Sequence, residues 1–162
     1  SDKAVGGIAR SAFEWGRYED ALNAYDIMLA HKPDRKSYQL NRAICLTNLA
    51  RYDEAEKVLF RLNYESPDDE NVNRVLAWTL TCDGKYEQAE KLYAQLLSVE
   101  KPLEEDLLNY GYCLWFSGSI DDAADCFHRF LMESGLEIPA TNKVAQPLES
   151  DWSSRVLLLE AL

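Results

Sequence analysis

The chain has 162 residues and a net charge of −11, with 47% hydrophobic and 28% charged residues. This composition is that of a globular protein with a buried core, and it excludes a largely disordered chain. No apolar run reaches the roughly 18 residues needed to cross a membrane. The strong negative charge argues against nucleic acid or anionic lipid as the main ligand. We therefore expect neither nucleic-acid nor membrane partners.

A ten-residue motif recurs four times along the chain. It reads GRYEDALNAY, ARYDEAEKVL, GKYEQAEKLY and GSIDDAADCF, starting at Gly16, Ala50, Gly84 and Gly118. The alanines in the middle of the four motifs, at positions 21, 55, 89 and 123, are each 34 residues apart. An unbroken period of this length is typical of stacked helix–turn–helix repeats.

Each repeat predicts two helices joined by a turn at the start of the motif, with a proline after the second helix in the first three repeats. The predicted helix pairs are 3–15 and 18–31, 35–49 and 52–63, 69–83 and 86–99, and 103–116 and 120–133. Within the first helix, Gly6 and Gly7 each cost about 1 kcal/mol relative to alanine, so we expect this helix to start late or to fray. Such hairpins cannot bury both faces alone and gain their stability by stacking on neighbours.

The packing pattern also recurs in every repeat. The central alanine lets two helices approach closely, and a large residue four positions later is expected to fill the space beside it. These large residues are Tyr25, Leu59, Tyr93 and Phe127, and a small residue occurs in each first helix at Ala9, Ala43, Ala77 and Gly111.

Over residues 2–137 this combination resembles the tetratricopeptide repeat family. The shared features are a small residue in the first helix, a Gly-x-Tyr turn, acidic residues before the central alanine, a large residue four positions later and a closing proline. Ala50 and Ile120 depart from the turn pattern, and the fourth repeat lacks the proline. The resemblance implies an all-α fold, a right-handed superhelix (α-solenoid) of four antiparallel helix hairpins.

The periodicity stops after Gly135. Residues 138–162 contain Pro139 and Pro147 and predict a connector followed by a C-terminal helix that starts near Ser150 or Asp151. We expect this helix to cap the fourth repeat; the alternatives are that it begins a further domain or folds back into the groove. The chain starts without methionine and stops within a helical pattern, so we expect it to be a piece of a longer protein.

In the tetratricopeptide repeat family the first helices of successive repeats line a concave groove, so the resemblance implies a peptide-binding surface on those helices. Nine candidate residues recur at intervals of 34: Leu40, Asn41, Ile44, Arg74, Val75, Trp78, Leu108, Asn109 and Tyr112. Trp115 extends the contribution of the fourth repeat. Asparagine side chains can hold a peptide backbone, and aromatic walls can hold apolar anchors. Alternatively, Trp78 and Trp115 pack between helices.

One subclass of the family binds the C-terminal carboxylate of heat-shock chaperones through lysine, arginine and asparagine side chains. The matching positions here hold Gly6, Arg10, Asn41, Asn71 and Val75. Because the lysines are absent, we do not expect that ligand.

The sequence contains no recognisable catalytic motif, metal-ligand spacing or phosphate-binding loop, so we expect no enzyme activity, metal or cofactor. His31 and His128 are the only histidines and have no nucleophile placed beside them by a known motif. The cysteines, at positions 45, 82, 113 and 126, form no CxxC pair. They are expected to be free buried thiols, which favours the cytoplasm.

We therefore predict a protein–protein interaction module that binds a peptide or a partner helix in the concave groove. Three alternatives stay open: a structural scaffold that forms homo-oligomers through the array ends, a secretion-type chaperone for an unfolded client, and a regulatory part of a larger protein. The step from fold to interaction is an analogy, since repeat scaffolds serve many functions.

Overall fold

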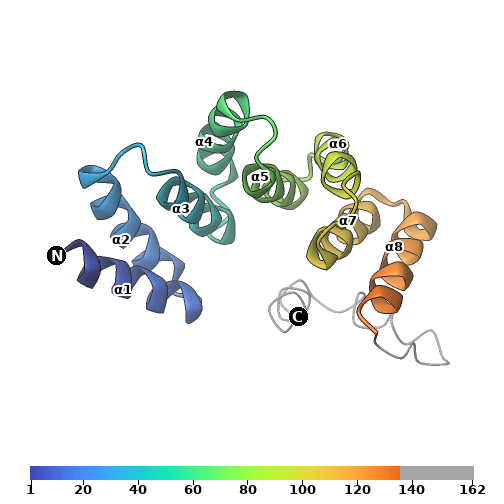
Figure 1. Ribbon diagram of the computed structural model, residues 1–162, viewed down its shortest axis with the longest axis horizontal. Coiled ribbons are helices and arrows are strands. Elements are labelled where there is room, and N and C mark those ends of the chain that lie inside the picture. Colours follow the sequence, from blue (N-terminus) through green and yellow to red (C-terminus); the bar gives the residue numbers. More distant parts are fainter. Residues whose placement is uncertain (136–162) are drawn as a thin grey trace. The chain divides into compact units, whose positions relative to one another are not determined.

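The computed structural model describes residues 1–135, and the connector and C-terminal helix predicted for 138–162 lie outside this range. The described residues form eight α-helices and no strand (Figure 1). The helices are α1 (Asp2–Glu14), α2 (Tyr18–His31), α3 (Lys36–Asn48), α4 (Tyr52–Glu65), α5 (Glu70–Cys82), α6 (Tyr86–Leu97), α7 (Glu104–Ser117) and α8 (Ile120–Glu133). The prediction of an all-α protein built from helix hairpins is confirmed.

The chain divides into two compact units within the predicted array. Unit 1 comprises Ser1–Leu96, and unit 2 begins at Leu97. Unit 1 contains the first three hairpins, and the described part of unit 2 contains α7 and α8. None of the helices described here is long and apolar enough to span a membrane.

The first helix is continuous from Asp2, so the expectation that Gly6 and Gly7 delay its start is wrong. The Ser1 hydroxyl accepts a hydrogen bond from the Ala4 backbone N–H, which satisfies one of the donors that a helix start leaves unpaired. A Cβ on Gly6 would lie 3.6 Å from the Met28 side chain, in ordinary contact. The packing of α1 on α2 thus offsets the low helix propensity of the two glycines.

The four turns between paired helices share a left-handed backbone conformation. Glycine supplies it at Gly16, Gly84 and Gly118, with φ values of 70°, 77° and 92°. The equivalent residue of the second repeat is Ala50, which adopts φ 57° despite its Cβ. An L-residue with a side chain is disfavoured there by about 1–2 kcal/mol.

Replacing Ala50 by glycine is therefore expected to raise the free energy of unfolding by about 0.5–1 kcal/mol, because the steric cost of the Cβ outweighs the added entropy of the unfolded chain. Urea unfolding followed by circular dichroism measures the change. The matched control is Ala94→Gly, an exposed position inside α6, which should lose up to about 1 kcal/mol. A loss in both variants would contradict the strain at Ala50.

The predicted pairing of small and large residues forms the core of each hairpin. All four central alanines, Ala21, Ala55, Ala89 and Ala123, are fully buried. Their large partners are buried as well: Tyr25, Leu59, Tyr93 and Phe127. The residues that the repeat motif assigns to the core are therefore buried in all four hairpins.

Neighbouring hairpins of unit 1 pack mainly through the second helix of one hairpin and the first helix of the next, α2 on α3 and α4 on α5, and polar contacts add to this packing. The hydroxyls of Thr47 in α3 and Thr79 in α5 lie 2.7 Å apart and are both buried. Arg42 in α3 donates a hydrogen bond to Asp26 in α2 over 2.6 Å. Contacts of α3 with α2 on one side and with α5 on the other thus hold the first three hairpins together.

Candidate functional site

Unit 1 contains a cavity of about 850 Å³ formed by the first hairpin and α3. Its walls combine aromatic and aliphatic side chains with polar ones. The lining residues are Lys3, Gly6, Gly7, Arg10, Phe13, Glu14, Tyr25, Met28, Arg35, Ser37, Tyr38 and Asn41. The two glycines of α1 leave part of this volume open because they carry no side chain.

The aromatic wall of the cavity is held in place by contacts between the helices. The rings of Tyr25 and Tyr38 lie 6.4 Å apart, and the guanidinium of Arg35 lies 5.0 Å from the Tyr38 ring centre. Burial raises the pKa of the Tyr25 hydroxyl, while a hydrogen bond with the Asn41 side chain acts in the opposite direction. Asn41 therefore helps to orient the wall of the cavity and borders its open volume.

The cavity carries an excess of positive charge. Among the described lining residues, Lys3, Arg10 and Arg35 contribute cations and Glu14 contributes the one carboxylate. This balance is the reverse of that of the whole chain, whose net charge is −11. A ligand with a negatively charged group would therefore be attracted to this part of an otherwise acidic protein.

Six of the residues predicted for the groove belong to unit 1. Leu40, Asn41 and Ile44 lie on α3, and Arg74, Val75 and Trp78 lie on α5; all six are half-buried. The Arg74 guanidinium donates a hydrogen bond to the Asn71 side chain over 3.1 Å. Of the six, only Asn41 lines the cavity.

The other four predicted residues lie on α7 in unit 2. Leu108 and Tyr112 are 4% and 1% exposed and belong to the core of the unit rather than to an open surface. The Tyr112 ring packs against Phe127 at 5.3 Å and against Phe116 at 6.3 Å. Asn109 and Trp115 are half-buried, and the buried Oδ1 atom of Asn109 has no hydrogen-bond donor within residues 1–135.

Most of the cavity lining was missed by the sequence analysis. Tyr25 and Met28 come from the second helix of a hairpin, and Arg35 and Ser37 from the start of the next one. The groove residues were predicted from the first helix of each repeat, so residues of second helices and of helix starts were not considered. One feature of the sequence could have indicated the cavity. Gly7 occupies the position of Asn41 in the first repeat, and Gly6, Gly7 and Arg10 together offer open space beside a cation.

An acidic cluster joins the second and third hairpins. Carboxylate oxygens of Asp53, Glu56 and Asp83 lie within 4.8 Å of one another, close enough in principle to hold a metal ion. However, the Lys85 ammonium lies 2.7 Å from a Glu56 oxygen and 3.2 Å from an Asp83 oxygen. Because this cation already balances part of the negative charge, we interpret the cluster as an ionic link between hairpins.

Because of Glu56 in this cluster, we expect the free energy of unfolding to depend on pH. Burial raises its pKa above the usual value of 4.5, and the nearby Lys85 only partly counteracts this. A carboxyl with a raised pKa in the folded state contributes stability that is complete below its unfolded pKa and is lost as the pH rises through the folded pKa. The Glu56→Gln variant should therefore gain stability relative to the parent protein as the pH rises above about 4.5.

Urea unfolding at several pH values tests this expectation. Glu54→Gln is the matched control, because the Arg51 side chain lowers the pKa of Glu54 through a hydrogen bond. A lowered pKa stabilises the fold above the unfolded pKa, so the control should lose stability relative to the parent protein as the pH rises. If the stability of both variants changed with pH in the same direction, the opposite pKa shifts of Glu56 and Glu54 would be contradicted.

The cysteines are poorly suited to nucleophilic chemistry. Burial raises the pKa of Cys45 to about 11 and that of Cys82 to about 12. Burial also raises the pKa of Cys126. Since the thiolate is the reactive form, these thiols are largely unreactive at neutral pH.

Two family models match the chain, and both describe the tetratricopeptide repeat. One covers residues 12–79 and the other residues 74–107. Together they cover residues 12–107, from the end of α1 to the start of the fourth repeat. No curated protein matches the chain in sequence.

Several solved structures share this fold. A tetratricopeptide repeat protein from Parabacteroides merdae is 18% identical with a TM-score of 0.77, covering 99% of this chain and 70% of that one. A thermophilic repeat protein of the same kind from Thermus thermophilus is 17% identical with a TM-score of 0.72, covering 82% and 74%. MamA from Desulfovibrio magneticus is 15% identical with a TM-score of 0.68, covering 82% and 75%. Identities this low establish a common fold and nothing further.

Proposed function

This chain belongs to the tetratricopeptide repeat family, and from that premise we propose that it binds a segment of a partner protein in the cavity of unit 1. Proteins of this family generally act as interaction modules rather than as enzymes. The single observation that carries the proposal is the cavity itself, which combines aromatic walls, an amide side chain and an excess of cations. Its volume of about 850 Å³ lies within the ~300–1,000 Å³ range of ligand sites.

The chemistry of the lining favours a peptide with both an apolar and an acidic side chain. Tyr38 and Phe13 are half-buried and offer apolar surface to the ligand. Arg10 and Arg35 are exposed and can pair with a carboxylate, and arginine does so with two parallel hydrogen bonds. Asn41 can donate to and accept from a peptide backbone. The proposed ligand is therefore a short segment with an acidic residue near an apolar anchor.

The half-buried residues on α3 and α5 extend the proposed site along unit 1. Leu40, Ile44, Val75 and Trp78 would add apolar contacts, and Arg74 would add a further cation. The predicted residues of unit 2 form a separate proposal: Asn109 and Trp115 are half-buried and would offer an amide and apolar surface to a ligand of that unit. Leu108 and Tyr112 lie in the core of unit 2 and would support this surface from within.

Selection from a peptide library against the purified chain tests the proposal. We expect enrichment of peptides that combine an acidic and an apolar residue. Arg10→Glu should weaken the selected peptides at least tenfold, which is about 1.4 kcal/mol. The control is Arg61→Glu on α4, an exposed arginine outside the cavity lining, which should change the affinity less than twofold. Equal losses in the two variants would indicate a general charge effect and would overturn the assignment.

The extension along α5 has its own test. Trp78→Ala should weaken the same peptides if the ligand continues beyond the cavity, with folding checked by circular dichroism. An unchanged affinity in a folded variant would confine the site to the first hairpin and α3.

A further inference from the structure

A buried carboxylate lies at the junction between the second and third hairpins, where the preceding junction has a leucine. Glu56 in α4 is 5% exposed, and the equivalent position 34 residues earlier, in α2, holds Leu22, which is 3% exposed. Asp83, at the end of α5, likewise takes the position of Leu49. Two apolar positions of the first junction are therefore acidic in the second. Taking a carboxylate out of water is costly unless its charge is compensated, so this junction requires a cation.

Lys85 compensates only part of the acidic cluster that Asp53, Glu56 and Asp83 form. Its ammonium lies 2.7 Å from Oε2 of Glu56 and 3.2 Å from Oδ2 of Asp83. The other Glu56 oxygen, Oε1, is buried and has no hydrogen-bond partner within residues 1–135. Three carboxylates and one ammonium leave the cluster with a charge of −2. The cluster therefore has both an unsatisfied buried oxygen and the charge that a divalent cation would neutralise.

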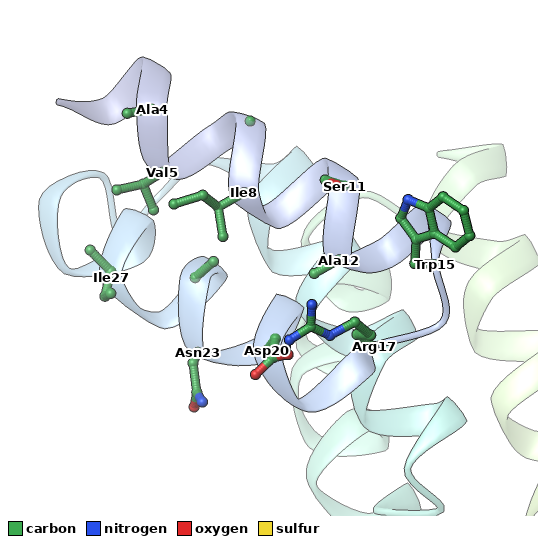
Figure 2. A pocket seen from close by; sticks show the side chains of 12 residues that line it. Ala4, Val5, Ile8, Ser11, Ala12, Trp15, Arg17, Asp20, Asn23 and Ile27 are labelled. Atoms are coloured by element: carbon green, nitrogen blue, oxygen red, sulfur yellow. Dashed lines mark ion pairs between the residues drawn. The ribbon is translucent and has the colours of Figure 1, made fainter.

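The cavity on the α1–α2 hairpin shows the opposite case, in which the charges are already balanced (Figure 2). This cavity has a volume of about 600 Å³, and the charged residues of its described lining are Arg17 and Asp20, which form an ion pair. One cation meets one anion there, so a further ion is not required. In the cluster around Glu56 the carboxylates outnumber the ammonium three to one.

The spacing of the three carboxylates fits a calcium ion. Carboxylate oxygens of Asp53, Glu56 and Asp83 lie within 4.8 Å of one another. Ca²⁺ binds oxygen at about 2.3–2.6 Å, so two of its ligands can lie up to about 5 Å apart. Mg²⁺ binds at about 2.0–2.1 Å and demands an octahedral arrangement, so its ligands lie at most about 4.2 Å apart. A cavity of about 300 Å³ lined by Asp53 and Asp83 offers room for the water molecules that would complete the calcium coordination.

We propose that unit 1 binds one Ca²⁺ between the second and third hairpins, with Asp53, Glu56 and Asp83 as its protein ligands. Asp53 and Glu56 are three residues apart and lie on the same side of α4, whereas Asp83 comes from the end of α5. The ion links two hairpins and gives the unpaired Glu56 oxygen a partner. This site was not expected from the sequence, since its ligands come from two different hairpins.

The calcium affinity is expected to be low. Ca²⁺ takes about 6–8 oxygen ligands, of which the cluster supplies few, and the Lys85 ammonium competes for two of the carboxylates. We therefore expect a dissociation constant of about 0.1–1 mM. The site is separate from the proposed peptide cavity, whose lining contains none of the three ligands, so either proposal can fail without the other.

Urea unfolding of the full chain with and without Ca²⁺ tests the proposal. After metals are removed with a chelator, about 10 mM CaCl₂ should raise the ratio of folded to unfolded protein about 10- to 100-fold. NaCl at the same ionic strength controls for screening and should have a much smaller effect. Isothermal titration calorimetry should give one site per chain, with MgCl₂ binding more weakly than CaCl₂. A stability that responds to CaCl₂ no more than to NaCl, or a preference for Mg²⁺, would overturn the proposal.

Asp53→Asn should weaken calcium binding at least tenfold, because it removes one of the three carboxylate ligands. Asp53 is exposed, so the variant is expected to fold, and circular dichroism checks this. The matched control is Glu87→Gln, an exposed acidic residue at the same position of the next repeat and outside the cluster. It should change the calcium affinity less than twofold. Equal losses in the two variants would indicate a general charge effect and would exclude this site.

Glu56→Gln separates ligation of the ion from stability of the fold. In the presence of a chelator at neutral pH this variant should be at least as stable as the parent protein, because it removes a buried charge. When CaCl₂ is added, the parent protein should gain stability and the variant should gain little. A variant that is stabilised by Ca²⁺ as much as the parent protein would show that Glu56 is not a ligand.

Discussion

The Leu76→Ala variant is expected to lose about 3 kcal/mol of free energy of unfolding, whereas Ile8→Ala should lose less than about 0.5 kcal/mol. The two residues occupy the same position of the repeat, in α5 and in α1. Leu76 is 1% exposed and Ile8 is 59% exposed. Truncating a buried leucine removes apolar contacts and leaves a cavity, but truncating an exposed isoleucine removes little that was shielded from water.

Urea unfolding monitored by circular dichroism gives both values. Equal losses in the two variants would mean that the stability of this position comes from contacts within a hairpin. The stacking of hairpins would then not be the source of the difference in burial.

The second large effect is expected at Gly111 in α7. A Cβ at this position would lie 2.7 Å from Cε1 and 2.9 Å from Cδ1 of the Phe127 ring, which is itself buried. Overpacking of this kind costs about 1–3 kcal/mol and outweighs the roughly 1 kcal/mol that alanine gains over glycine inside a helix. Gly111→Ala should therefore destabilise unit 2, as measured by urea unfolding followed by circular dichroism.

Two further variants separate overpacking from other causes. Gly7→Ala in α1 adds a Cβ with nothing within 4 Å and should stabilise the protein by about 0.5–1 kcal/mol. Adding Phe127→Leu to Gly111→Ala reproduces the pair Ala43 and Leu59 of the second repeat and should recover part of the loss. A double variant less stable than the sum of its two single changes would contradict a steric conflict between these residues.

The 34-residue period was sufficient to predict the helices, the turns between them and the contact that closes each hairpin. The predicted bounds of α2 and α8 agree with the structure at both ends, and the central alanines are fully buried. These features could be predicted because they depend on residues within one repeat and recur in each. The continuity of α1 through Gly6 and Gly7 could not, because it depends on packing against α2 rather than on local propensity.

The 34-residue period was less successful in predicting which residues form an open surface. The period identifies Ile44, Trp78 and Tyr112 as equivalent, yet Tyr112 is 1% exposed and the other two are half-buried. Gly111 in α7 allows the Phe127 ring to approach, and that ring contacts Tyr112. Equivalent positions therefore differ in accessibility because their neighbours differ in size.

The repeat pattern was enough to predict the family, the all-α fold and the order of the hairpins, since a repeated local pattern specifies a repeated local structure. The cavity of unit 1 could be found only in the folded protein, because Tyr25, Arg35 and Asn41 come from different elements that packing brings together. The 34-residue period shows which positions of the repeats are equivalent, but the burial of each residue depends on the side chains that pack against it in the folded protein.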